Sequence, residues 1–193
     1  MAYRETPKVK AALAAKREAI LEATLAAIGD GNAGNNIVGH VASRVGVSVG
    51  SVYHHFADVE ELLTRAMGHA LAGDLAAMRE AASRERFPLN ALARATAVFY
   101  RRQRRPRLAR YLAADPHYVR GIRPEFEKLI AAALDAPDSR VMAAACLGAI
   151  YGVRAVAGNT DAGAVAAVAV VLRALGVPNQ GVERLSNAAI EEA

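Results

Sequence analysis

The spacing of the apolar residues constrains the fold of this chain more than any other feature of its sequence. Apolar residues recur at three- and four-residue steps through most of the chain, with the clearest run from Val59 to Met78, and this is the period of one face of an α-helix. No segment shows a convincing strand alternation. The short run "VAVVL" lies in an Ala-rich segment that Asp161 is placed to cap and that Gly176 and Pro178 end. We therefore expect an all-α protein.

Turn-forming residues divide this pattern into about nine helices. The stretch "GDGNAGNN" (residues 29–36) separates the first helix from a short second one, and a third covers roughly residues 49–55. The long helix that follows has Asp58 at its N-cap position and Glu61 three residues later, which is the capping-box spacing. Five further helical patterns come after it, one of them beginning near Pro106, a favoured first-turn residue.

The composition is that of a folded protein, and the length suits one large or two small domains. Hydrophobic residues make up 53% of the 193 residues, which is ample for a core. We expect a three-helix domain in residues 1–57, joined by a long helix to a C-terminal helical bundle in residues 58–193. The N-terminus lacks the apolar run of a signal peptide, and the most apolar stretch, residues 162–177, is interrupted by Arg173. With one cysteine, Cys146, the chain is expected to be cytoplasmic and not to enter a membrane.

The segment "VASRVGVSVGSVYHHF" (residues 41–56) encodes a helix, a sharp turn and a capped helix. Gly46 follows the second helix where a left-handed residue would end it, and glycine adopts that conformation without steric cost. Ser48 can accept a hydrogen bond from the amides that open the third helix, and Val47 and Val52 have the hydrophobic-staple spacing. These features describe a helix-turn-helix motif.

The third helix begins with small residues and continues with polar aromatic side chains. Ser48, Gly50 and Ser51 are small, so the backbone can approach another surface, and Tyr53 and the two histidines after it add hydrogen-bonding groups. Short polar groups and exposed amides suit contact with phosphates and with the floor of a DNA groove. The alternative for the histidines is a favourable position beside the C-terminal dipole of the helix. Phe56 is apolar and is expected to face the core.

Followed by "DVEELL", this stretch resembles the DNA-binding region of TetR-family transcriptional regulators. The resemblance covers roughly residues 15–65; beyond them the chain fits the family only by its length and helical pattern. It implies a homodimer that binds a double-stranded DNA operator and an unknown small-molecule effector. The matching positions are Val41, Ala42, Gly46, Val47, Ser48, Gly50, Val52, Tyr53, His55, Phe56, Glu61, Leu62 and Leu63.

The resemblance also implies which residues face DNA, with the third helix in the major groove. Val49, Ser51 and His54 would lie nearer the bases, whereas Tyr53 and His55 would mainly hold phosphates. The start of the second helix would lie near the DNA backbone, and the basic N-terminal arm would add electrostatic attraction. The expected DNA-binding residues are Asn36, Val38, Gly39, Ser48, Val49, Gly50, Ser51, Tyr53, His54, His55, Lys16 and Arg17.

The sequence departs from the family pattern at several of these positions. Asn36 stands where the family often has Ser or Thr, and Gly39 has no side chain with which to reach a base. Val49 and Val59 occupy positions where the family often carries Lys, so two expected phosphate contacts are missing. Val49 can instead contact a thymine methyl group.

The C-terminal domain contains candidate ligand-binding residues among its apolar helices. These are Met67, Leu71, Phe99, Tyr111, Tyr118, Met142, Cys146, Tyr151 and Arg154. The three tyrosines and Arg154 are the strongest candidates, because a polar group on an apolar helical surface needs a partner. Arg154 would pair with an acidic ligand or with an internal acid. Ordinary core packing is the alternative for most of this set.

The last two helical segments, residues 141–157 and 162–175, are rich in Ala, Gly and Val, and such small residues permit close helix packing. The resemblance implies that they pair with their copies in a second subunit as a four-helix interface. A twofold-symmetric dimer would bind a palindrome-like operator with recognition helices about one helical turn apart, roughly 34–36 Å.

No motif calls for catalysis, a cofactor or a metal. The chain has no Gly-rich phosphate loop, no GxSxG and no Glu-x-x-His pair, and the adjacent residues His54 and His55 do not share a helix face. We expect a regulator that is not an enzyme, and most simply a repressor released by its ligand. The alternatives are an activator of the same fold, or a helical small-molecule-binding protein or enzyme with a vestigial helix-turn-helix.

Overall fold

The computed structural model describes residues 6–34, 36–134 and 138–191, and all the regular secondary structure in these ranges is helical. The helices in these ranges are α1 (Pro7–Asp30), α2 (Ile37–Val45), α3 (Val49–His55), α4 (Val59–Ser83), α5 (Pro88–Arg102), α6 (Pro106–Ala114), α7 (Pro116–Ala133), α8 (Ser139–Ala157), α9 (Asp161–Ala174) and α10 (Asn179–Glu191). The expected all-α fold is confirmed. The chain forms two compact units, Met1–Ala70 and Leu71–Ala193, and α4 contributes residues to both. The functional division at residues 57 and 58 stays a prediction.

The described residues contain ten helices where the sequence pattern indicated about nine. The additional helix is α10, which follows Pro178. Its apolar residues Val182, Leu185 and Ala189 are buried, and the helix packs against α5 and α9. Because this apolar stripe is narrow and flanked by polar residues, it is a weak signal in the sequence and becomes clear only where α10 meets its neighbours.

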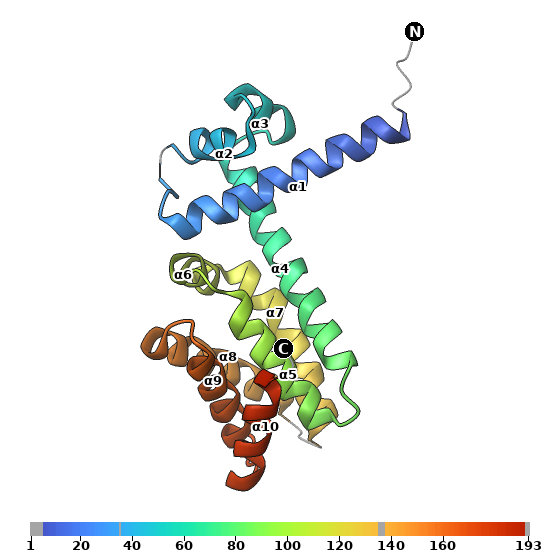
Figure 1. Cartoon of the computed structure of the whole chain (residues 1–193), viewed down its shortest axis with the longest axis vertical. Coiled ribbons are helices and arrows are strands. Elements are labelled where there is room, and N and C mark those ends of the chain that lie inside the picture. Colours follow the sequence, from blue (N-terminus) through green and yellow to red (C-terminus); the bar gives the residue numbers. More distant parts are fainter. Residues whose placement is uncertain (1–5, 35, 135–137, 192–193) are drawn as a thin grey trace. The chain divides into compact units, whose positions relative to one another are not determined.

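The first unit is built around a small core that α1, α2 and α3 share with the beginning of α4. Ile20, Val41, Val52 and Phe56 are each no more than 1% exposed. Only the second half of α1 contributes to this core, and Leu13, which the periodicity assigned to the buried face, is exposed. The first half of α1 projects beyond α2 and α3 and carries basic residues (Figure 1).

Side-chain caps begin several of the helices. The Glu61 amide donates a hydrogen bond of 2.7 Å to Asp58 Oδ1, as the capping-box spacing predicts, while the Glu61 carboxylate accepts from the amide of Ala57. At α9 the expectation was wrong by one residue. Thr160, not Asp161, is the N-cap, and its hydroxyl accepts from the Gly163 amide at 2.9 Å.

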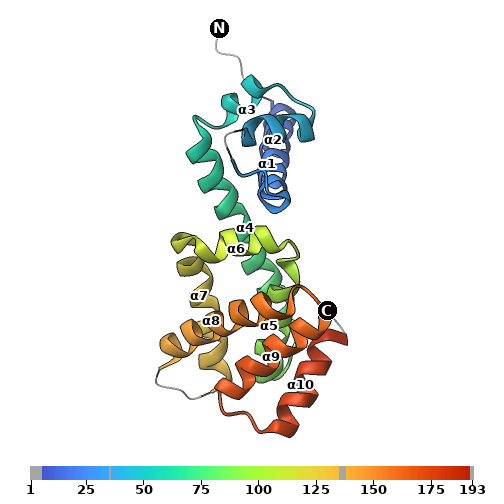
Figure 2. The ribbon, with the colours of Figure 1, turned by 90° about the vertical axis from the view of Figure 1, so that its left-hand side faces the viewer.

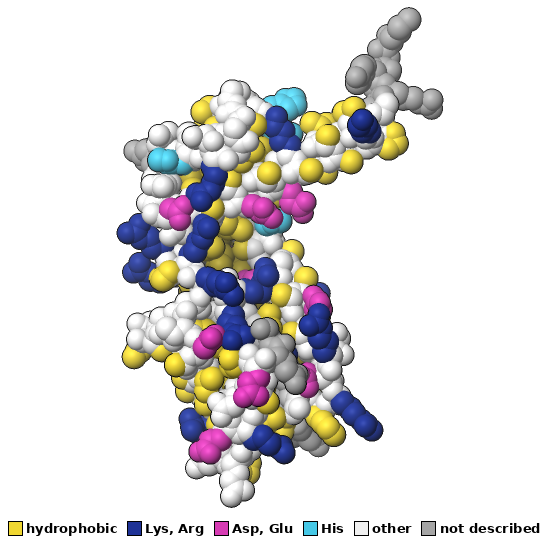
Figure 3. Space-filling view, in the orientation of Figure 1, with side chains coloured by type: hydrophobic (Ala, Val, Ile, Leu, Met, Phe, Trp, Pro, Cys, Tyr) yellow, Lys and Arg dark blue, Asp and Glu magenta, His cyan; other side chains and the backbone are white. Residues whose placement is uncertain are grey.

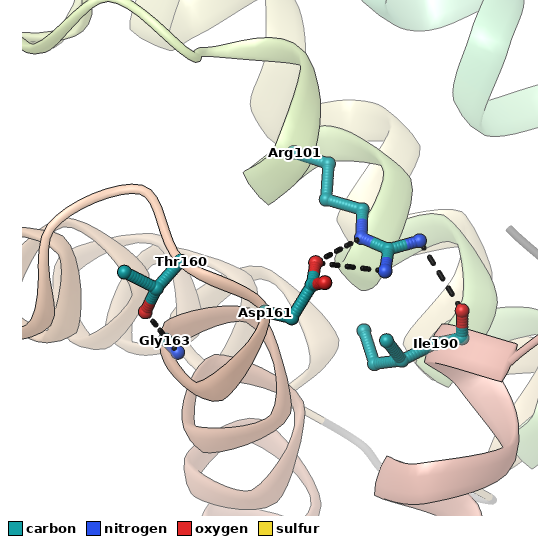
Figure 4. Close-up of polar contacts among 5 residues, drawn as sticks. All are labelled: Arg101, Thr160, Asp161, Gly163 and Ile190. Atoms are coloured by element: carbon teal, nitrogen blue, oxygen red, sulfur yellow. Dashed lines mark hydrogen bonds and ion pairs between the residues drawn. The ribbon is translucent and has the colours of Figure 1, made fainter.

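The second unit is organised around α5, which is buried along most of its length and packs against α7, α9 and α10. Figure 2 shows α8 and α9 beside each other, with α10 next to α9. At one end of this group, Arg101 of α5 points between the start of α9 and the end of α10 (Figure 4). Its guanidinium lies 2.8 Å from the Asp161 carboxylate and donates to the Ile190 carbonyl at 3.2 Å, so it ties three helices together.

Helix α8 has an apolar face that its own unit leaves uncovered. Val141 and Val156 are 64% and 91% exposed, and the small residues between them, Ala145, Gly148 and Gly152, are also exposed. These positions follow helical spacing, and the buried residues of α8 lie on the opposite side. Length and hydropathy alone would let α8 cross a membrane, but a helix that packs against other protein passes the same test, so this is weak evidence.

Candidate nucleic-acid interface and ligand cavity

The turn between α2 and α3 has the geometry that the sequence predicts. Gly46 adopts a left-handed conformation with φ of 73°, and the Val47 amide donates to the Ala42 carbonyl at 2.9 Å. The Ser48 hydroxyl caps α3 by accepting from the Ser51 amide at 3.1 Å. These local bonds set the direction in which α3 leaves the turn, and they leave its first residues at the surface.

The outer side of α3 is exposed and carries the residues expected to contact DNA. Val49 and Tyr53 are 44% and 45% exposed, Gly50 and His54 are exposed, and Ser51 and His55 are half-buried. The inner side holds Val52, which lies in the core. Helix α3 therefore presents a face of small residues followed by rings, as a helix that docks against another surface requires.

The structure places basic residues of α1 beside the end of α3. Lys16, Arg17 and His54 all act electrostatically on His55, and the guanidinium of Arg17 lies 5.0 Å from the centre of the Phe56 ring. Burial lowers the pKa of His55, and the positive charges of its three basic neighbours lower it further. Figure 3 shows histidine and basic side chains side by side over this region. We call Lys16, Arg17, His54 and His55 the basic cluster.

The start of α2 differs in two respects from what the sequence indicated. Asn36 occupies the N-cap position, but its side chain makes no capping hydrogen bond and lies against Gly39 instead. Val38 is buried at 7% exposure, so its side chain packs in the core of the first unit and only its backbone could lie near DNA.

The second unit contains a cavity of about 400 Å³ beside α6 and α8. Its polar lining comes from Gln103, Arg110, Tyr151, Arg154 and Asn159, and the rest is mostly small and apolar. None of the described lining residues is acidic, and Figure 3 shows Lys and Arg side chains gathered around the α6 region. A cavity of this size is within the range that holds small ligands.

Arg154 is the central polar residue of this cavity. It is 9% exposed, and its guanidinium donates to the main-chain carbonyls of Gln103 and Tyr100 at 2.7 and 2.5 Å and stacks 4.0 Å from the centre of the Tyr100 ring. A longer contact of 3.5 Å joins it to Asn159 Oδ1, and its Nε atom is buried without a hydrogen-bond partner. Burial lowers the pKa of this guanidinium. The sequence left open that Arg154 pairs with an acid of the chain. The hydrogen bonds of Arg154 instead go to neutral groups.

A second polar group beside the cavity links Tyr118 to the acid Asp74. The Tyr118 hydroxyl donates to the buried Asp74 carboxylate and accepts from Gln103 Nε2 at 3.1 Å. Asp74 also accepts from Arg102 Nε at 2.7 Å, so this acid has its own cation. The Tyr151 hydroxyl and Gln103 Oε1 are buried without hydrogen-bond partners of acceptable geometry. Burial raises the pKa of Tyr151 to about 12, although Gln103, as a hydrogen-bonding neighbour, acts to lower it.

The structure brings only some of the predicted pocket residues together. Tyr151 and Arg154 line the cavity, and Tyr118 is joined to it through Gln103. Six further residues of the predicted set do not line it. Phe99 and Cys146 are buried, Leu71, Tyr111 and Met142 are half-buried in the second unit, and Met67 is buried in the first unit.

Sequence reasoning missed Gln103 and Asn159 because both lie in connecting segments without helical periodicity. A polar residue between two helices is ordinary in a sequence, and only the closure of α6 and α8 around the cavity gives these two a role. Among the described residues there is no group of three His, Cys, Asp or Glu side chains that could hold a metal ion.

Comparison with known proteins finds similarity to the family that the helix-turn-helix segment resembles. Residues 20–66 match the family model described as bacterial regulatory proteins, tetR family. No curated protein sequence matches the chain. Among solved structures, RolR in complex with the ligand resorcinol has a TM-score of 0.62 at 16% identity, covering 90% of this chain and 95% of RolR.

Two further solved structures have the same fold. A TetR-family transcription regulator from Marinobacter aquaeolei has a TM-score of 0.57 at 21% identity, covering 94% of this chain and 97% of that protein. A putative TetR-family regulator from Mesorhizobium loti has a TM-score of 0.56 at 17% identity, covering 93% and 95%. Residues 20–66 thus match the tetR family of bacterial regulatory proteins, and the chain as a whole shares the fold of these solved structures.

Proposed function

We propose that the protein is a cytoplasmic, homodimeric transcriptional regulator that binds operator DNA through α3 and is a repressor released by a small-molecule ligand. The observation that carries this proposal is the exposed face of α3 next to the basic cluster, in the region that matches the family model. The fold and the helix-turn-helix support DNA binding more directly than they support the sign of regulation.

Helix α3 is suited to the major groove because its leading residues are small. Ser48 and Gly50 let its backbone approach the bases, and Val49 offers an apolar contact for a thymine methyl group. Tyr53, at 45% exposure, can donate a hydrogen bond to a phosphate. Lys16 and Arg17 of the basic cluster, at the other end of α3, supply positive charge that favours the DNA backbone and makes affinity depend on salt.

Dimerisation through α8 is supported by its exposed apolar face. Exposed apolar patches of this kind on a folded protein commonly mark an interface, and the small residues of α8 would let a second α8 approach closely. Helix α9, which the sequence assigned to the same interface, is largely enclosed by α5, α8 and α10 and has less surface to offer. A symmetric pair of subunits would bind two operator half-sites.

Ligand release needs a second state of the chain. RolR has been solved with resorcinol, so the fold accepts a small aromatic molecule in that protein. In this chain we assign the effector to the cavity lined by Arg154. A ligand that prefers one arrangement of the second unit would shift α4, which also contributes residues to the first unit, and would lower the population that binds DNA.

The test of DNA binding is the affinity of the full chain for DNA from its own promoter region, measured by fluorescence anisotropy at several salt concentrations. We expect affinity to fall steeply with salt and to fall about 10-fold or more in the double variant Tyr53→Ala, His55→Ala. The matched control is His117→Ala, Lys128→Ala, which removes exposed residues of the second unit and should leave affinity unchanged. Salt-independent affinity, or equal affinity of both double variants, would refute DNA binding through α3.

The direction of regulation is tested separately with a promoter reporter in a strain from which the gene has been deleted. A repressor predicts that reporter expression rises on deletion and falls on complementation. The opposite result assigns an activator of the same fold.

A further inference from the structure

We propose that the cavity beside α6 and α8 binds a small monocarboxylate with an apolar ring, held by Arg154 and Tyr151. This inference deepens the proposed function by naming the ligand class of its effector cavity. It rests on the second unit alone, because every residue that lines the cavity lies in that unit.

The first argument is the charge of Arg154. A buried cation is costly unless an anion is close to it, and this guanidinium contacts two main-chain carbonyls, the ring of Tyr100 and the amide of Asn159, all of them neutral. The nearby acid Asp74 acts on Arg154 electrostatically, but its carboxylate contacts Arg102 and Tyr118 directly, and the hydrogen bonds of Arg154 go to neutral groups. An anionic ligand would therefore supply the direct ionic contact that Arg154 lacks.

The second argument is the unused hydrogen-bonding capacity around the same guanidinium. Arg154 Nε is a buried donor without a partner, and the Tyr151 hydroxyl and Gln103 Oε1 are buried without a hydrogen bond of good geometry, although Gln103 lies close enough to act on Tyr151. Unsatisfied buried polar groups are costly, and a bound ligand can relieve that cost. Two such donors, one on the guanidinium itself and one beside it, suit a carboxylate. The Asn159 contact, at 3.5 Å, is long enough for a carboxylate to displace it.

The third argument is the remainder of the lining. Pro106, Ala109, Ala113 and Ala155 are small or apolar, and Arg110 adds a second positive charge. Apolar walls around a few polar groups bind an apolar body by its shape and orient it by its charged end. The volume of about 400 Å³ accommodates a single substituted ring. An additional hydroxyl on that ring could donate to Gln103 Oε1.

The test is isothermal titration calorimetry of the full-length protein, without DNA, against a panel of carboxylates paired with their neutral amides. The panel contains benzoate, 4-hydroxybenzoate, phenylacetate and cyclohexanecarboxylate. We expect at least one carboxylate to bind about 10-fold or more tightly than its amide, because hydrogen bonds to a charged group are the stronger ones. Equal affinity of each acid and its amide, or no binding of any acid at millimolar concentration, would overturn the proposal.

The variants locate the site. Tyr151→Phe removes a hydroxyl that makes no hydrogen bond of good geometry in the free chain, so the protein should stay folded and lose about 10-fold in carboxylate affinity. Tyr111→Phe is its control, since Tyr111 does not line the cavity. Arg110→Gln should also weaken binding of the acid and leave binding of the amide unchanged. Arg104→Gln, which removes the same charge outside the cavity, should leave binding of both unchanged. An acid bound equally well by wild type and Tyr151→Phe would refute this site.

Failure of this ligand proposal can be distinguished from failure of the proposed function. If no carboxylate binds and the protein still binds promoter DNA with the expected salt dependence, the ligand class is wrong and DNA binding stands. If carboxylates bind as expected and DNA does not, the cavity is assigned and the regulatory function is refuted.

Discussion

The Tyr118 hydroxyl of α7 donates a hydrogen bond to the buried carboxylate of Asp74 in α4, across 44 residues of sequence. Asp74 lies at the same time 2.7 Å from Arg102 Nε at the end of α5, so one acid connects three helices of the second unit. Burial and the Asp74 charge raise the pKa of Tyr118, which therefore stays a donor at all physiological pH values.

This arrangement predicts that the hydroxyls of Tyr118 and Tyr151 contribute unequally to stability. Tyr118→Phe should lower the free energy of unfolding by about 1–2 kcal/mol, because Asp74 and Gln103 each lose a partner. Tyr151→Phe should cost less, under about 1 kcal/mol, since its hydroxyl makes no hydrogen bond of good geometry. Urea denaturation followed by circular dichroism measures both. Equal losses would show that the Asp74 bond does not stabilise the unit.

The contacts of Arg101 with Asp161 and Ile190 predict that Arg101→Ala and Asp161→Ala affect stability unequally. Arg101→Ala should destabilise the protein by about 1–2 kcal/mol, because the side chain is mostly buried and binds both Asp161 and the Ile190 carbonyl. Asp161→Ala should cost less than about 1 kcal/mol, since Asp161 is 76% exposed and exposed ion pairs contribute little. Thermal unfolding of both variants at low and high salt checks this. A larger loss for Asp161→Ala would contradict it.

Gly163 lies where a side chain would not fit. A Cβ at this position would clash with the Tyr100 hydroxyl and would lie 3.0 Å from the main-chain oxygen of Gly158. Gly163→Ala should therefore destabilise the second unit by about 1–3 kcal/mol. Gly68→Ala is the control, because a Cβ there meets open space and alanine favours helix, so it should stabilise by up to about 1 kcal/mol. The midpoints of urea unfolding test the pair.

The exposed face of α8 predicts the effect of a charge on assembly. Val156→Glu should leave the subunit folded, because Val156 is 91% exposed, and should shift the protein from dimer to monomer. Phe87→Glu introduces the same charge at an exposed apolar residue outside α8 and should not change the assembly. Size-exclusion chromatography with light scattering distinguishes the two. An intact Val156→Glu dimer would place the interface elsewhere.

The lowered pKa of His55 predicts a pH dependence of DNA binding. In the free protein burial and the basic neighbours of His55 favour its neutral form, whereas a DNA phosphate favours the protonated form, so binding takes up a proton. Affinity should therefore rise as the pH falls from about 8 to 6, by about 10-fold for each unit by which DNA raises the pKa. His55→Gln should flatten this dependence, and His117→Ala should not. A rise of the same size in His55→Gln would assign the proton to another group.

Local chemistry explains which parts of the molecule were predictable. Periodicity, Gly46 at the turn, the Ser48 cap and the Asp58–Glu61 box act over at most a few residues, so the helix-turn-helix and the all-α fold follow from short-range spacing. The same spacing placed the cap of α9 one residue late, because neighbouring Thr160 and Asp161 are both good caps.

The contacts that build the cavity were decided by packing between distant helices. Arg154 holds the carbonyls of Tyr100 and Gln103 from more than fifty positions along the chain. No local pattern determines which of the many arginines is buried or which groups it contacts. Nor does any local pattern determine that α10 packs against α5 and α9. Such pairings depend on which helix faces meet, and burial sets their energy, because a charge or hydroxyl that water would satisfy at the surface needs a specific partner once the helices close around it.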